Sequence, residues 1–98
     1  MNGQSSTSMP WISQGNYESF RKILIDGATL PIRYEEWRTH VQRRIDMLAA
    51  QGHAMVKVDV DPDLFTTWCR ERSVPISSQS CSRYAMEVMA LRAAREQD

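Results

Sequence analysis

The sequence predicts a small, mostly helical α+β fold with three to four helices and one short two-stranded ribbon, formed within the chain or across a dimer. Residues 34–51 carry apolar side chains at spacings of three and four, which is the pattern of a helix with one buried face. Residues 55–60 alternate apolar and polar side chains, which is the pattern of a half-buried strand. The chain has 98 residues, the length of one domain with a modest core.

The N-terminal region, residues 1–14, is rich in Ser and Gln, and we predict a flexible tail there, followed by a single small globular domain over residues 15–98. Met9, Trp11 and Ile12 interrupt the tail with side chains that could pack against the fold or against a partner, so the order of this region is left open. The N-terminus lacks the basic and apolar regions of a signal peptide, and no apolar run is long enough to cross a membrane. We therefore expect a cytoplasmic protein.

A first helix is predicted over residues 16–25, because Tyr17, Phe20 and Leu24 follow one another at spacings of three and four. The segment Lys22–Ile25 could instead be a strand, and the sequence leaves this alternative open. An Asp-Gly pair ends the helix, since Gly adopts the positive φ that a helix exit favours.

The second helix, residues 34–51, is the clearest element in the sequence. Its apolar stripe consists of Tyr34, Trp37, Val41, Ile45 and Leu48. Its outer face carries Arg38, Arg43 and Arg44, which form either an ordinary solvated helix face or a basic patch for phosphate or an acidic partner. The formal net charge of the chain is zero, so binding to nucleic acid or to an anionic membrane would need such a local patch.

A strand is predicted over residues 53–60. Its alternation separates two faces, with Val56, Val58 and Val60 on one and Met55, Lys57 and Asp59 on the other. A lone strand leaves its backbone N–H and C=O groups unpaired, so this strand needs a partner. The partner could be a segment of the same chain, at Lys22–Ile25 or Ala28–Ile32. It could also be the same strand of a second copy, which would make a homodimer through Met55–Val60.

Two more helices are predicted in the C-terminal half. Asp61 can cap a helix over residues 62–72, with Pro62 at its first position. The expected apolar face of this helix consists of Leu64, Phe65, Trp68 and Cys69. A last helix is expected from Ser77 or Ser78 to residue 95, and its apolar stripe consists of Cys81, Tyr84, Ala85, Val88 and Leu91. Both cysteines are therefore expected to be buried free thiols.

Several kinds of chemistry lack their sequence signature. Asp59, Asp61 and Asp63 resemble the start of a calcium loop, but Leu64 and Arg70 stand where such a loop needs Gly and Glu. The histidines and cysteines have no zinc-ligand spacing, and no Ser lies in the Gly-rich turn of a catalytic nucleophile. We therefore expect no metal, no cofactor and no catalytic residue, and hence a protein that is not an enzyme.

The order strand, helix, turn, helix over residues 55–93 resembles ribbon-helix-helix DNA-binding modules. The resemblance rests on Val56–Leu64, an alternating strand that leads into a capped helix, and on Trp68, which stands where the family has a core Leu. Members of this family are dimers whose paired strands enter the major groove. By this resemblance, the residues that contact DNA would be Met55, Lys57 and Asp59.

The stretch from Tyr17 onward also resembles small bacterial proteins of no assigned function that are often found among mobile-element genes. The residues that carry this resemblance are Tyr34–Trp37, Val58–Asp63, Phe65, Trp68 and Cys69. The resemblance implies a bacterial, cytoplasmic setting and no known chemistry.

The leading hypothesis is a non-catalytic binding or regulatory protein that acts through a protein partner. It is favoured by a compact core, by a tail that carries a Trp, and by the lack of catalytic signatures. The alternative is a dimeric DNA-binding regulator of the ribbon-helix-helix type. That alternative requires pairing through Met55–Val60 and an affinity that falls steeply with salt.

Overall fold

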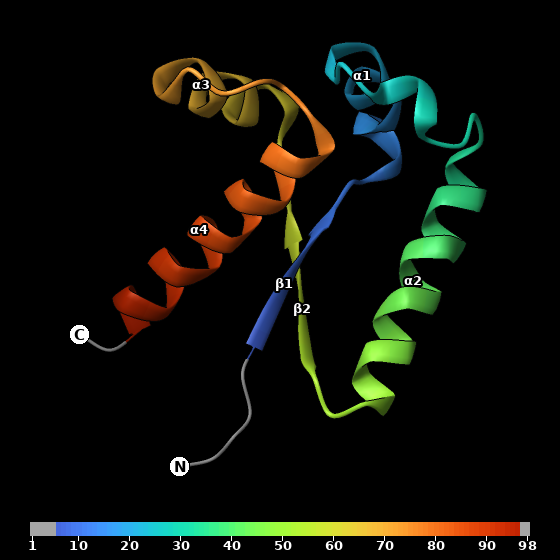
Figure 1. Ribbon diagram of the computed structural model, residues 1–98, viewed down its shortest axis with the longest axis vertical. Coiled ribbons are helices and arrows are strands. Elements are labelled where there is room, and N and C mark those ends of the chain that lie inside the picture. The colour runs from blue at the N-terminus through green and yellow to red at the C-terminus, as the bar shows by residue number, and fades with distance from the viewer. Residues whose placement is uncertain (1–5, 97–98) are drawn as a thin grey trace.

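The computed structural model describes residues 6–96, and this part of the chain contains four α-helices, one 3-10 helix and two strands. In chain order they are β1 (Ser6–Trp11), α1 (Gln14–Ile23), the 3-10 helix η1 (Gly27–Thr29), α2 (Tyr34–Ala50), β2 (Ala54–Asp59), α3 (Pro62–Arg72) and α4 (Ser78–Glu96). Figure 1 shows the strands side by side between α2 and α4, with α1 and α3 at the end toward which both strands point. The predicted fold class is confirmed.

The two strands form a parallel ribbon within the chain, in which Trp11 lies opposite Asp59. A parallel pair needs a long crossover connection, and α1, η1 and α2 supply it. The partner of β2 is therefore neither of the two segments that were predicted to pair with it within the chain. Lys22–Ile25 contains the end of α1, and Ala28–Ile32 contains part of η1.

The prediction of a flexible tail over residues 1–14 is wrong for residues 6–14, because β1 and the first residue of α1 lie there. Residues 1–5 lie outside the described part of the chain. The sequence of β1 is Ser-Thr-Ser-Met-Pro-Trp, which has no apolar alternation and contains a proline. Proline cannot donate to a ladder but is tolerated in an edge strand, so this strand forms without the usual pattern.

Contacts from α2 hold the end of β1 in place. The Tyr34 hydroxyl donates a hydrogen bond of 2.9 Å to the backbone oxygen of Ile12, and the ring centroids of Trp11 and Trp37 are 5.3 Å apart. Ile12 itself is only 5% exposed. Of the apolar residues that interrupt the N-terminal region, Ile12 therefore belongs to the core and Trp11 packs against it.

The alternation predicted for β2 is observed only toward the end of the strand, because Met55 is half-buried and Val56 is exposed. Val58 and Val60 are buried, whereas Lys57 and Asp59 are exposed. The strand therefore contributes one apolar face to the core.

The core lies where α1, α3 and the ends of the strands meet. Phe20 of α1 and Phe65 of α3 are fully buried, and their ring centroids are 6.1 Å apart. The other buried members of this cluster are Ile12, Tyr17, Leu24, Trp37, Val60, Cys69 and Cys81. This confirms the predicted burial of both thiols, which are free cysteines.

Two expected core positions are wrong. Leu64 and Leu91 are 64% and 60% exposed. Leu64 lies in the first turn of α3, on the solvent side of Phe65, and Leu91 lies in the half of α4 beyond Ala85, which is the last buried residue of that helix. Helical spacing placed both leucines on the apolar face of their helix, but no neighbouring element covers them.

The cap predicted for α3 is present, and it supports a first test. The Asp61 carboxylate accepts hydrogen bonds from the backbone N–H groups of Asp63 and Leu64, at 2.8 and 3.0 Å. We expect Asp61→Ala to lower the free energy of unfolding by about 1 kcal/mol, because it removes the acceptor for both groups. Urea denaturation measures the change. Asp61→Asn is the control, since Asn caps equally well, and equal losses in both variants would contradict this role of the cap.

Candidate binding pocket

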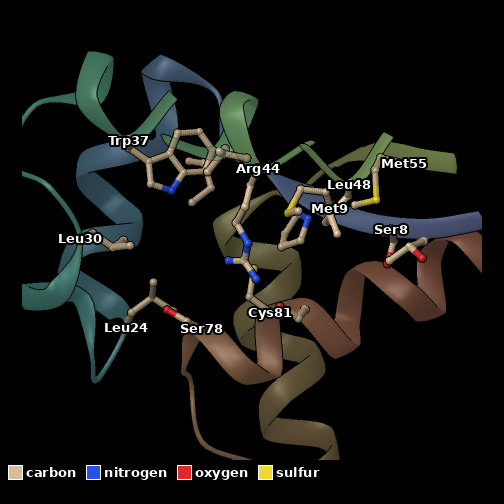
Figure 2. A pocket seen from close by; sticks show the side chains of 15 residues that line it. Ser8, Met9, Leu24, Leu30, Trp37, Arg44, Leu48, Met55, Ser78 and Cys81 are labelled. Atoms are coloured by element: carbon tan, nitrogen blue, oxygen red, sulfur yellow. The ribbon is translucent and has the colours of Figure 1, made fainter. Parts of the chain in front are cut away.

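A pocket of about 340 Å³ lies between β1, α2 and the first turns of α4. Figure 2 shows the fifteen side chains that line it. They are Thr7, Ser8, Met9, Pro10, Ile12, Leu24, Leu30, Trp37, Val41, Arg44, Leu48, Met55, Ser78, Cys81 and Ser82. They come from separate parts of the chain, so the pocket exists only in the folded protein.

The wall of the pocket is mostly apolar. The helix α2 contributes Trp37, Val41 and Leu48, and the two strands contribute Met9 and Met55. Methionine is flexible and polarisable, so a wall of this kind can adapt to the shape of an apolar group. An apolar hollow with a few polar groups is the usual form of a ligand site, and such sites have volumes of about 300–1,000 Å³.

Arg44 is the one charged residue among the fifteen that line the pocket, and no Asp or Glu is among them. In Figure 2 its side chain extends from α2 across the pocket toward the first turn of α4. Its guanidinium makes no ion pair and no hydrogen bond with any side chain in residues 7–96. The pocket therefore combines apolar walls with a cation whose hydrogen-bonding capacity is free within the described chain.

The first two turns of α4 add hydroxyl groups to the pocket, from Ser78 and Ser82. Two of the leading backbone N–H groups of α4 already have side-chain acceptors. Ser78 N–H donates to the Asp26 carboxylate at 3.1 Å, and Ser80 N–H donates to the Ser77 hydroxyl at 3.2 Å. An anion in the pocket would therefore find its donor in Arg44 rather than at this helix end.

Cys81 is the thiol at the wall of the pocket, and it is only 4% exposed. Burial raises the pKa of Cys81 to about 12, and the nearby Cys69 and Asp26 add to the rise. The thiolate is the nucleophilic form of cysteine, so at neutral pH this group is a protonated, unreactive thiol. Cys81 thus behaves as an apolar part of the wall.

The predicted basic patch is divided by the structure. Arg44 lines the apolar pocket, whereas Arg43 lines a second hollow beside Glu35 and Glu36, and Arg38 lines neither of these two. Adjacent residues of a helix point about 100° apart, so consecutive arginines need not share a surface. The three side chains do not act on one site in this structure.

The residues proposed for DNA contact alternate along β2, but their surroundings differ. Met55 lines the apolar pocket, the Lys57 ammonium lies 4.1 Å from the centroid of the Trp11 ring, and Asp59 is exposed. One edge of β2 is occupied by β1. The homodimer through Met55–Val60 stays a prediction, and it would have to use the other edge of this strand.

The spacing of Arg44 along its helix is a sequence signal for the pocket. Arg44 lies three residues after Val41 and four before Leu48, so it is on the apolar side of its helix. Arg44 therefore shares a helix face with two apolar residues that line the pocket. The residues from β1 and α4 had no such signal, because their neighbourhood depends on the parallel ribbon.

Within residues 6–96, no group of three His, Cys, Asp or Glu side chains is arranged to hold a metal ion. In the same part of the chain, no helix has both the length and the apolar character needed to cross a membrane. Comparison of the chain with protein-family models, curated proteins and solved structures finds no match in any of the three.

Proposed function

We propose that this chain is a non-catalytic binding protein that recognises a protein partner, and that the partner places an apolar side chain in the pocket between β1, α2 and α4. The observation that carries the proposal is the wall of this pocket, which is apolar apart from Arg44 and a few hydroxyl groups. Thr7, Arg44 and Ser82 line the pocket and are also exposed, so it reaches the surface. A side chain of a partner can therefore enter it without unfolding any element.

Binding explains the composition of the pocket better than catalysis does. The fifteen lining residues include no His, Asp or Glu that could act as a general base, and Cys81 is held as a thiol by its raised pKa. The remaining polar groups are hydroxyls and one guanidinium, which can orient a bound group by hydrogen bonding. Apolar walls with a few orienting polar groups are typical of recognition.

Peptide selection tests this proposal. Two libraries of short random peptides would be displayed on phage, one with a free C-terminus and the other with a fixed polar linker after the random residues. We expect selected peptides to share an apolar residue and to bind with micromolar or better affinity, about −8 kcal/mol. Ser82→Trp should weaken binding at least about tenfold, because Ser82 is exposed at the pocket and the larger side chain fills it.

Ser19→Trp is the matched control. Ser19 is an exposed serine on α1 that does not line the pocket, so this variant should bind the selected peptides as the unmodified chain does. Circular dichroism would first establish that both variants fold. The proposal is refuted if neither library yields binders, or if the binders tolerate Ser82→Trp as well as Ser19→Trp.

The DNA-binding alternative gains no specific support from this arrangement and stays a prediction. Of its three contact residues, Met55 lines the pocket, and Lys57, which would be expected to meet DNA, lies over the Trp11 ring instead. Acidic Asp59 on the same strand would repel a phosphate backbone.

A further inference from the structure

We infer that the segment recognised by the pocket is the free C-terminus of the partner, with its last side chain, an apolar one, among the methionines and its terminal carboxylate on Arg44. This inference rests on the proposed function and adds the chemistry of the partner to it. The steps that lead to it are the position of Arg44, the absence of acids from the pocket wall, and the limited volume of the pocket.

The position of Arg44 gives the pocket its charge preference. The residue lies between Val41 and Leu48 on the apolar side of α2, and its side chain crosses the pocket in Figure 2. Arg44 is exposed, so a ligand at the mouth of the pocket can reach its guanidinium. Its planar donors also match the two oxygens of a carboxylate.

Within residues 7–96, no Asp or Glu forms an ion pair with Arg44. None of the fifteen lining residues is Asp or Glu, and the nearby Asp26 carboxylate accepts the Ser78 N–H at the start of α4. The adjacent Arg43 differs, because Glu35 and Glu36 line the same hollow as that arginine. Within residues 7–96, Arg44 therefore remains open to a carboxylate that a ligand brings to the pocket.

The size of the pocket favours a chain end over an internal acidic residue. A volume of about 340 Å³ is near the lower end of the range for ligand sites. An internal Asp or Glu brings its carboxylate on a separate side chain, and the backbone must continue in both directions past the pocket. At a C-terminus the carboxylate and the last side chain branch from the same carbon atom, and no further residue follows. One compact unit then offers both the charge and the apolar group.

The two libraries distinguish this inference from the function on which it rests. We expect binders that depend on the pocket to come from the library with free C-termini, with an apolar last residue. The best peptide would then be synthesised as the free acid and as the carboxamide, and both would be titrated by calorimetry. We expect the acid to bind about tenfold more tightly than the amide, which corresponds to about 1.4 kcal/mol.

Arg44→Gln should remove most of this preference, leaving the acid and the amide within about twofold of each other. Arg43→Gln is the matched control, because it removes the same charge from an adjacent exposed residue of α2 that faces another hollow. It should retain the full preference. N-acetyl-leucine, a small free carboxylate, should bind far more weakly than the peptide.

Each contrary result has one meaning. If the acid and the amide bind equally and both are lost in Ser82→Trp, the pocket binds a partner but the C-terminal inference is overturned. If only the linker library yields pocket binders, the inference is likewise overturned. If N-acetyl-leucine binds as tightly as the peptide, the site serves a small carboxylate, and the partner's C-terminus is rejected. If Arg43→Gln also loses the preference for the acid over the amide, that preference arises from the overall charge of α2 rather than from Arg44.

Discussion

Phe65→Ala is expected to lower the free energy of unfolding by about 3–5 kcal/mol, the range for removing a buried aromatic ring. Phe65 is fully buried at the centre of the core. Its ring centroid lies 6.1 Å from that of Phe20 and 5.6 Å from that of Tyr84, so it joins α1, α3 and α4. Loss of the ring removes these contacts and leaves a cavity that the neighbouring helices can close only in part.

Leu64→Ala is the matched control for this prediction. Leu64 is adjacent in α3 but 64% exposed, so its truncation should change the free energy of unfolding by less than about 0.5 kcal/mol. Urea denaturation followed by circular dichroism measures both changes. Phe65→Leu keeps part of the side chain and should fall between the two, which preserves the test if Phe65→Ala does not fold. Equal effects at residues 64 and 65 would contradict the described packing of α3.

Gly27→Ala is expected to be destabilising by at least about 1–3 kcal/mol, the usual cost of an extra group in a packed region. A Cβ atom at Gly27 would lie 2.0 Å from the backbone oxygen of Arg21. The obstacle is backbone rather than a flexible side chain, so relief requires α1 or η1 to move. Such a movement would also displace Leu24 and Leu30, which line the pocket.

Gly15→Ala separates this steric effect from the general effect of replacing glycine. Gly15 lies in the first turn of α1, and a Cβ there meets nothing within 4 Å. Alanine is the better helix former, so this variant should unfold at the same or a slightly higher temperature. Thermal denaturation of both variants gives the comparison. A Gly27→Ala variant as stable as Gly15→Ala would contradict the close approach of η1 to α1.

Local patterns in the sequence were sufficient for much of the fold. The helices α2 and α3 lie within a residue of their predicted ranges, and β2 lies inside the predicted strand. These elements depend on caps and on apolar periodicity, both of which are written in neighbouring residues. The cap on α3 shows this well, because the sequence places Asp61 directly before Pro62 and the structure shows its two hydrogen bonds.

Neighbouring elements decided the burial of particular side chains. Leu64 and Leu91 have core spacing but lie where no other element covers them, whereas Ile12, in a polar region of the sequence, is buried. Periodicity states which residues share a face of a helix. It does not state how much of that face another element reaches.

By itself, the sequence determined α2, α3, α4 and the strand β2 with its buried Val58, whereas it left the end of α1 open between helix and strand. The interactions that specify these elements join residues only a few positions apart. Only the tertiary structure decided that Ser6–Trp11 is the second strand, since its pairing with β2 joins segments separated by α1 and α2. The same pairing brings Met9 to Met55 and to Arg44 around one pocket. A contact between distant segments depends on the packing of everything between them, and no local pattern of residues records it.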